Sequence, residues 1–212
     1  MTFPKAKRLS FFESTPKDVY IAFSGGMDSS VLLHSLIAKR NKNITLIWVN
    51  HNTPFRKVEE EFVKKVAERY KLPVITFRIP EYPGYGSLEH YWSVERNSIF
   101  QRMDKTVLTG HHLNDAVETY VMSTFTGTSK LLNYRNGNIL RPMICVPKTD
   151  IVYRAKRFNL EYLEDPTNND LEFNLRNKVR HQLYPELMKV FPGIETTVRR
   201  MIRTKEQRHN LC

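Results

Sequence analysis

The residues best suited to chemistry form the run Ser24-Gly25-Gly26-Met27-Asp28-Ser29-Ser30, which follows a short apolar segment. Adjacent glycines let the backbone approach a ligand, and successive N–H groups with the positive end of a following helix solvate phosphate oxygens. The serines add hydroxyl donors. Asp28 tolerates nearby phosphates only with a cation between them, so we expect it to hold Mg²⁺. The alternative is a glycine turn followed by a helix cap.

Neither of two better-known phosphate loops is present. No lysine follows as in GxxxxGK[ST], and the chain contains no GxGxxG, so the run is neither a kinase-type nucleotide loop nor a dinucleotide fingerprint.

A second polar cluster lies in residues 110–119, which contain His111, His112, Asp115 and Glu118. Asp115 and Glu118 are three residues apart and share one face of a helix. Two carboxylates facing a cleft suit a cationic amine. They could equally complement the positive end of a helix, with both histidines as ordinary loop residues. A metal site through both histidines is disfavoured because adjacent side chains point in different directions.

The elements that must position these clusters alternate between strand and helix. Apolar runs predict strands at 19–23, 44–49, 74–79 and 106–109, and helical spacing predicts helices at 29–40, 58–70, 88–103 and 114–124. This alternation predicts an α/β fold, a doubly wound parallel sheet with helices on both faces and ligands at the carboxyl ends of its strands.

Beyond residue 130 the alternation weakens. We expect a strand at 139–143, a helix at 149–158, a turn at 165–170, and helices at 171–187 and 194–208. The predicted domains are an α/β domain at 1–130, which carries the glycine run, and a helical part at 131–212 that completes the site.

The charge balance indicates a polyanionic partner. The chain of 212 residues has 33 Lys and Arg against 22 Asp and Glu, a formal charge of +11. The densest basic run contains Arg199, Arg200 and Arg203, spaced along a helix surface, although such a run also suits a merely solvated face.

Cysteine usage and hydropathy exclude several classes of protein. Cys145 and Cys212 have no ligand-type spacing, which argues against a disulfide scaffold, a zinc finger and an iron–sulfur cluster. No apolar run of membrane-spanning or signal-peptide type is present, so we expect a soluble, cytoplasmic protein.

Three segments resemble one family. The run at 24–30 resembles the SGGxDS motif of the N-type ATP pyrophosphatases, the PP-loop superfamily. Residues 110–119 resemble the HHxxDxxET motif of the tRNA(Ile)-lysidine synthetases, a PP-loop family. Residues 164–170, with Arg176 and Arg180, resemble that family's EDPTN…RNxxRH signature, and 141–143 its RPL segment. Glu89 and Arg96 look like part of its E…R helix.

The resemblance implies ATP-dependent attachment of lysine to C2 of the wobble cytidine in a tRNA(Ile) with a CAU anticodon, through an adenylated cytidine. The implied catalytic residues are Asp28, with Mg²⁺, and Asp115, Glu118 and Arg176. Implied ATP-binding residues are Ser24, Gly25, Gly26, Met27, Asp28, Ser29, His51 and His111. Asp115 and Glu118 would hold lysine, and Arg176, Arg180, Arg199, Arg200 and Arg203 would contact tRNA.

The chain departs from the family pattern at several points. Asn114 and Asn50 replace acids, and Ser93 replaces an arginine. Larger members also carry C-terminal tRNA-binding domains, so we expect a short form, which could dimerise. Two alternatives stay open: a PP-loop tRNA 2-thiolation enzyme, and a tRNA-binding homologue without turnover.

Overall fold

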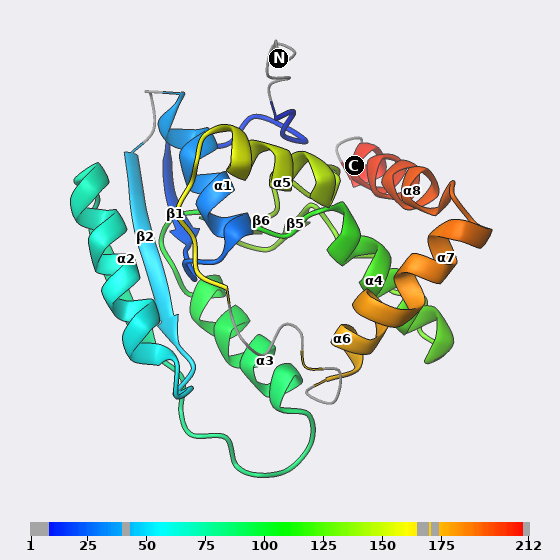
Figure 1. Cartoon of the computed structure of the whole chain (residues 1–212), viewed down its shortest axis with the longest axis horizontal. Coiled ribbons are helices and arrows are strands. Elements are labelled where there is room, and N and C mark those ends of the chain that lie inside the picture. Colours follow the sequence, from blue (N-terminus) through cyan, green and yellow to red (C-terminus); the bar gives the residue numbers. More distant parts are fainter. Residues whose placement is uncertain (1–8, 40–42, 165–169, 171–173, 210–212) are drawn as a thin grey trace.

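A six-stranded sheet organises the chain (Figure 1). This computed structural model describes residues 9–39, 43–164, 170 and 174–209. The strand order is β3-β2-β1-β4-β6-β5, and every pairing is parallel except that of β5 with β6. The strands are β1 (Asp18–Ala22), β2 (Asn43–Asn50), β3 (Val74–Arg78), β4 (Val107–Leu108), β5 (Arg135–Asn136) and β6 (Ile139–Leu140).

The helices follow the strands as the periodicity predicted. They are α1 (Met27–Ile37), α2 (Arg56–Tyr70), α3 (Leu88–Gln101), α4 (Leu113–Phe125), α5 (Lys148–Arg157), α6 (Leu175–Lys178), the π-helix η2 (Val179–Leu183), α7 (Tyr184–Val190) and α8 (Ile194–His209). None of the helices in the described ranges is long and apolar enough to cross a membrane.

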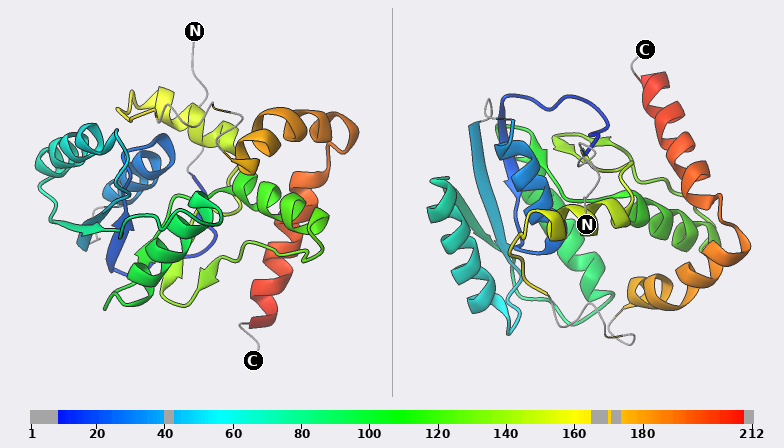
Figure 2. Two further views of the ribbon diagram at one scale, coloured as in Figure 1. Left: turned by 90° about the horizontal axis from the view of Figure 1, so that it is seen from below. Right: turned by 45° about the horizontal axis from the view of Figure 1, so that its top comes forward.

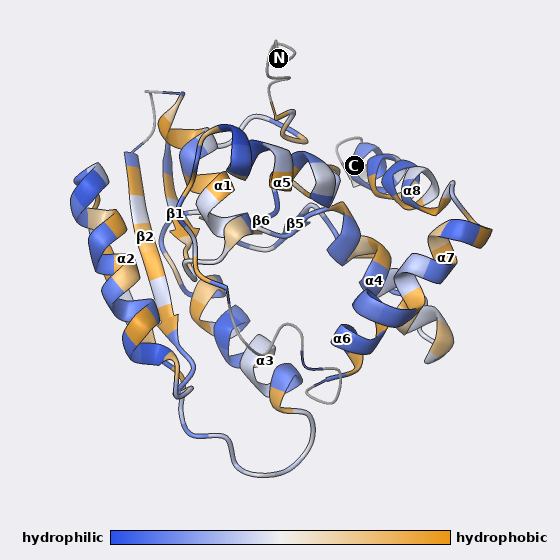
Figure 3. Cartoon of the chain, viewed as in Figure 1, coloured by the Kyte–Doolittle hydropathy of each residue, from blue (hydrophilic) through white to orange (hydrophobic). Residues whose placement is uncertain are grey.

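Side-chain alternation along the strands builds a core on each face of the sheet. Ile21 and Trp48 belong to the larger core, which also takes side chains from α1, α2, α4, α5 and α8. Tyr20 and Ile47, one residue away, belong to the smaller core, which α3 covers. The doubly wound α/β fold is therefore confirmed. In Figure 3 the apolar colour runs along β2, while α2 alternates between polar and apolar residues.

The larger core extends across the predicted domain boundary at residue 130. Strand β6 pairs with β4, and α5 packs against α1. Helix α8 packs beside α4, as both views in Figure 2 agree. Residues on both sides of the boundary, such as Ile21 and Ile202, belong to one cluster. The second part of the chain thus shares the sheet and the core of the first.

Two features differ from the expected elements. The strand expected at 139–143 ends at Leu140 and is joined by the short antiparallel β5. The helix expected up to residue 187 is broken into α6, η2 and α7. Pro185 at the start of α7 has no N–H for the carbonyl of His181, four residues earlier, which accounts for the irregular turn.

Candidate functional site

The glycine run forms a tight loop between β1 and α1. Gly25 has φ +82°, and a Cβ there would lie 2.9 Å from Cδ1 of Phe62, so the position requires glycine. The Ser29 hydroxyl donates to the carbonyl of Gly26 at 2.9 Å. The backbone N–H of Leu163 donates to the carbonyl of Gly25 at 2.8 Å, which supports the loop from behind. This geometry leaves the start of α1 facing the carboxyl edge of the sheet.

The second motif packs directly on this loop. A Cβ on Gly110 would lie 3.1 Å from the backbone carbon of Asp28 and from the backbone nitrogen of Ser29. Neither backbone atom can move away without opening the loop, so a side chain at this position would push the two motifs apart. Glycine at position 110 therefore allows them to pack in contact.

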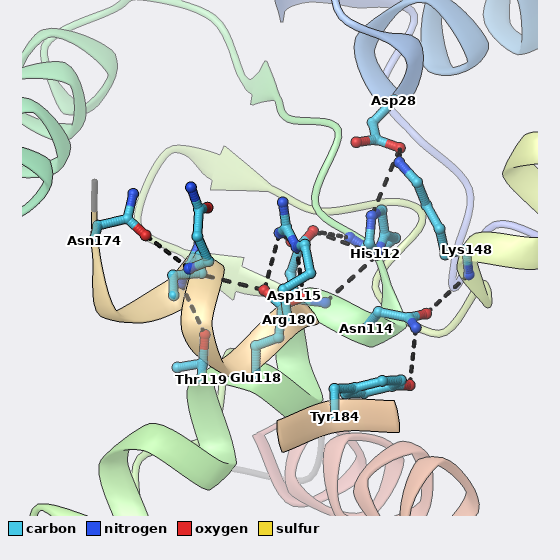
Figure 4. A network of polar contacts seen from close by, with 12 residues as sticks. Asp28, His112, Asn114, Asp115, Glu118, Thr119, Lys148, Asn174, Arg180 and Tyr184 are labelled. Atoms are coloured by element: carbon cyan, nitrogen blue, oxygen red, sulfur yellow. Dashed lines mark hydrogen bonds and ion pairs between the residues drawn. The ribbon is translucent and has the colours of Figure 1, made fainter. Parts of the chain in front are cut away.

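Asp28 points from the loop toward Lys148 and His112 (Figure 4). Its Oδ1 lies 2.5 Å from Nζ of Lys148 and 3.6 Å from Nε2 of His112. Burial would raise the pKa of the Asp28 carboxyl, but His112 and Lys148 hold it below its ordinary value. Asp28 is therefore ionised at neutral pH.

His112 connects the loop to the acids of the second motif. It caps α4 together with Asp115: the His112 backbone N–H donates to Oδ2 of Asp115 at 2.9 Å, and the Asp115 backbone N–H donates to Nδ1 of His112 at 3.4 Å. Burial opposes the charged imidazolium, yet the carboxylates of Asp115 and Asp28 raise the pKa of His112 above its ordinary value.

His111 turns the other way and lines the cleft. Its Nδ1 lies 2.8 Å from Oγ1 of Thr109. Burial, helped by the nearby guanidinium of Arg141, lowers the pKa of His111 to about 3. It is a neutral hydrogen-bonding group at physiological pH, and the two histidines do point in different directions.

Arg180 occupies the space between the two acids. Its Nε and its terminal nitrogen donate to the two oxygens of Glu118 at 2.8 and 2.9 Å, and the same terminal nitrogen lies 3.2 Å from Oδ1 of Asp115. The Glu118 side chain is only 2% exposed. The two carboxylates thus accommodate one cation, and Arg180 is engaged with acids.

Arg176 lies one turn earlier on the same wall. Its Nε is 3.5 Å from Glu89 and 3.9 Å from Glu118, and its terminal nitrogen donates to Thr119 at 3.3 Å. Arg96, which also lines the cleft, has its pKa lowered by burial and by the charge of Arg176. Two guanidinium groups therefore lie together on this part of the cleft.

Two adjoining cavities of about 360 and 440 Å³ make up the cleft, and Ser24, Asp28 and Glu59 line both. Predicted residues in the first are Ser24, Asp28, Ser29, His51, His111, Asp115 and Arg176. Predicted residues in the second are Ser24, Gly26, Met27, Asp28 and Arg180, joined there by Lys148 and Glu164. The turn predicted at 165–170 lies outside the described residues except for Asp170.

The other predicted arginines lie elsewhere. Arg199 and Arg203 line a separate groove formed by the segment 9–13, α5 and α8, and Arg200 is an exposed residue of α8 that does not line it. The structure therefore brings together the two motifs and Arg176 and Arg180, but not these three arginines.

Three residues in or beside the cleft had no predicted role: Lys148 and Arg96, which line it, and the buried His112. Lys148 lies 120 residues from Asp28 in the chain, and nothing in its local sequence indicates the pairing. For His112, the spacing to Asp115 is that of a helix-capping pair and could have been recognised.

The residues around Asp28 fit magnesium held jointly with a nucleotide. Both contacts to Asp28 use Oδ1, which leaves Oδ2 as a ligand. Within the described ranges, no group of three or more His, Cys, Asp or Glu is arranged to hold a metal ion alone. One carboxylate plus phosphate oxygens is the usual arrangement for Mg²⁺ at nucleotide sites.

Comparison with known proteins gives a consistent result. A family model described as a PP-loop domain matches residues 3–187. A tRNA(Ile)-lysidine synthase of Francisella tularensis subsp. holarctica is 29% identical over 93% of this chain and 52% of its own length. That of Buchnera aphidicola subsp. Schizaphis graminum is 35% identical over 81% of this chain and 42% of its own length. The chain thus spans about half the length of these curated relatives.

Among solved structures, the U34-tRNA thiolase NcsA of Methanococcus maripaludis superposes with a TM-score of 0.73. The two chains are 20% identical, and the match covers 88% of this chain and 70% of the thiolase. At this identity the likeness concerns the fold alone.

Proposed function

Because the chain belongs to the PP-loop domain family, we propose that it carries the catalytic site of an ATP-dependent ligase that joins lysine to C2 of a cytidine in tRNA. The observation that carries the proposal is the chain of contacts Asp28, His112, Asp115, which joins the phosphate loop to the HHxxDxxET helix in one cleft. One end suits the phosphates of ATP and the other a cationic amine.

The first step needs the phosphate loop. The C2 oxygen of a cytidine is a poor leaving group, so it first attacks the α-phosphorus of ATP and pyrophosphate departs. The loop amides from Gly25 onward and the start of α1 solvate the pyrophosphate oxygens. Magnesium held by Asp28 would supply further charge neutralisation there.

The second step needs the acids. The neutral lysine ε-amine attacks C2, AMP leaves with the former C2 oxygen, and the attacking nitrogen loses a proton to water. Burial opposes ionisation of Asp115, but the imidazole of His112 and a hydrogen bond from the His112 backbone N–H hold the pKa of its carboxyl well below its ordinary value. This favours a role in holding lysine by a cationic group over one in accepting a proton. We propose that lysine takes the place of the Arg180 guanidinium between Asp115 and Glu118.

The proposed substrate is a tRNA(Ile), the tRNA that the relatives' names contain. We further propose that it carries a CAU anticodon. The test incubates the protein with ATP, Mg²⁺, labelled lysine and this tRNA, and analyses the nucleosides by mass spectrometry. Lysidine is the expected product. Thiocytidine would support the thiolase alternative, and tRNA binding without any new nucleoside would support a homologue without turnover.

The position of the cysteine disfavours thiolation. Cys145 is the free cysteine in the described part of the chain, and it lines the groove beside α8, not the cleft. Cys212 lies outside the described residues. Substituting Cys145→Ser should therefore leave the product unchanged.

A further inference from the structure

The groove beside α8 is a second recess, larger than either cavity of the cleft. It measures about 760 Å³ and lies between the segment 9–13, the side of α5 and the helix α8. Val146 and Pro147 form part of its wall, while the next residue, Lys148, lines the cleft. The groove and the cleft therefore lie on two sides of the same short segment.

Three arginines without acidic partners line this groove. Arg154, Arg199 and Arg203 form no salt bridge with any acid in the described ranges. The Nε atoms of Arg154 and Arg199 are shielded from solvent and have no hydrogen-bond partner there. A buried donor that stays unpaired costs free energy, so these guanidinium groups are suited to an anion that the isolated chain lacks.

Aromatic rings lie beside the arginines. Tyr153 and Phe158 are 40% and 43% exposed, and Phe11 is half-buried. The guanidinium of Arg154 lies 4.9 Å from the centre of the Phe158 ring. The Phe158 ring also contacts His34, with ring centres 4.6 Å apart, and Nζ of Lys39 lies 4.2 Å from the centre of the Phe11 ring, so Tyr153 is the ring best placed to meet a base. An exposed ring beside arginines suits an unpaired nucleic-acid strand, since a base stacks on the ring while the arginines hold the phosphates.

Two acids, Glu13 and Asp150, also line the groove. They repel an anionic ligand, so neutralising either should strengthen binding.

We propose that this groove binds an unpaired segment of RNA, with Arg199 and Arg203 on its phosphates and Tyr153 against a base. The segment would belong to the same tRNA whose cytidine enters the cleft, and only this last point rests on the proposed function. The net charge of +11 suits a polyanion.

The test measures binding of a fluorescent oligouridine of about 12 nucleotides, a length within the range that such grooves cover. Arg199→Gln/Arg203→Gln should weaken binding about tenfold and reduce the slope of log affinity against log salt by about 1.4, the value for two lost contacts to a single strand. The matched control is Lys156→Gln/Lys205→Gln, which removes the same charge from exposed positions of α5 and α8 outside the groove. Tyr153→Ala should weaken binding severalfold at an unchanged slope, and Asp150→Asn should strengthen it.

Equal losses of RNA affinity in the two double variants would mean that RNA is attracted by the overall charge of the surface, and this would overturn the proposal. An unchanged RNA affinity in Tyr153→Ala would also overturn it. A change of mass in light scattering without a change in RNA affinity would assign the groove to a second copy. ATP binding in the cleft and thermal unfolding verify that each variant is folded. The binding measurement needs neither lysine nor ATP. The groove proposal can therefore be contradicted while lysidine is still formed, and lysidine can be absent while the groove still binds RNA.

Discussion

The phosphate loop and the wall formed by α4 and η2 face the same cleft but are built differently. The loop is held mainly through its backbone, with hydrogen bonds to the carbonyls of Gly25 and Gly26. The wall is held by charged side chains from distant parts of the chain, and 62 residues separate Glu118 from Arg180. The difference separates function from stability: a side chain of the loop can be removed at small cost to the fold, whereas a buried charge of the wall cannot.

The largest effect is expected at Asp28, where the loop meets the nucleotide. Asp28→Ala should reduce pyrophosphate release about 1000-fold, or about 4 kcal/mol of transition-state stabilisation. The side chains of Asp28 and Lys148 are each 35% exposed, so unfolding should shift by no more than about 1 kcal/mol. Pyrophosphate release and urea unfolding measure the two quantities. A loss of stability comparable to the loss of rate would remove the distinction between loop and wall.

The wall should respond in the opposite way. Arg180→Met leaves Glu118 buried without its partner, and this should cost about 3 kcal/mol in the free energy of unfolding. Glu118→Gln/Arg180→Met should recover most of that loss in a double-mutant cycle. The matched control is Lys189→Met, which breaks an exposed pair with Glu186 and should cost less than about 0.5 kcal/mol. Equal costs for Arg180 and Lys189 would contradict a buried charge network.

The same contrast explains what the sequence predicted. The loop was predictable because two glycines, an aspartate and a serine act within a few residues, between a strand and a helix that periodicity also identifies. The acids of α4 were predictable as a pair for the same reason. Their partner was not: Arg180 was expected to contact tRNA, and only the packing of η2 against α4 brings it to Glu118.

Other features missed from the sequence are also non-local. Strand β5 has only two residues and exists through its pairing with β6. Lys148 reaches Asp28 because α5 packs against α1. Local sequence carries no signal for such contacts, whereas the π-helix could have been suspected from Pro185.

His112 contacts Asp28 of the loop and Asp115 of the wall, and its pKa is raised, whereas the pKa of its neighbour His111 is lowered. Protonation of the two imidazoles should therefore change the stability of the fold in opposite directions. The raised pKa of His112 contributes stability that is complete below about pH 6.5 and is lost as the pH rises through its folded value. The pKa of about 3 for His111 contributes stability that is complete above about pH 6.5 and is lost as the pH falls toward 3.

The measurement is urea unfolding against pH without ATP or magnesium. The free energy of unfolding of the unsubstituted chain minus that of His112→Asn should decline as the pH rises above 6.5. The corresponding difference for His111→Asn should decline as the pH falls below 6.5. Each slope is limited to about 1.4 kcal/mol per pH unit. Slopes of the same sign for both residues would show that the two imidazoles share one environment.

The smallest effect is expected at Asn114, which supports the loop from the wall side. Its Oδ1 accepts from the backbone N–H of Lys148 at 2.9 Å, its Nδ2 donates to the Tyr184 hydroxyl at 2.8 Å, and that hydroxyl donates to Glu195. Asn114→Asp keeps the acceptor for the Lys148 N–H. It also places a second carboxylate, in addition to that of Glu195, beside the single proton of the Tyr184 hydroxyl. The cost should be about 1 kcal/mol in unfolding, with pyrophosphate release nearly unchanged.

The control variant is Asn114→Ala, which also removes the acceptor for Lys148. Because that bond fixes the start of α5 and hence the lysine beside Asp28, this variant should lower pyrophosphate release severalfold where the aspartate variant does not. If both variants lower the rate equally, the Tyr184 contact and not the Lys148 bond supports the loop. The wall would then act on catalysis through α7 and α8, and the separation between the two regions would be incomplete at this residue.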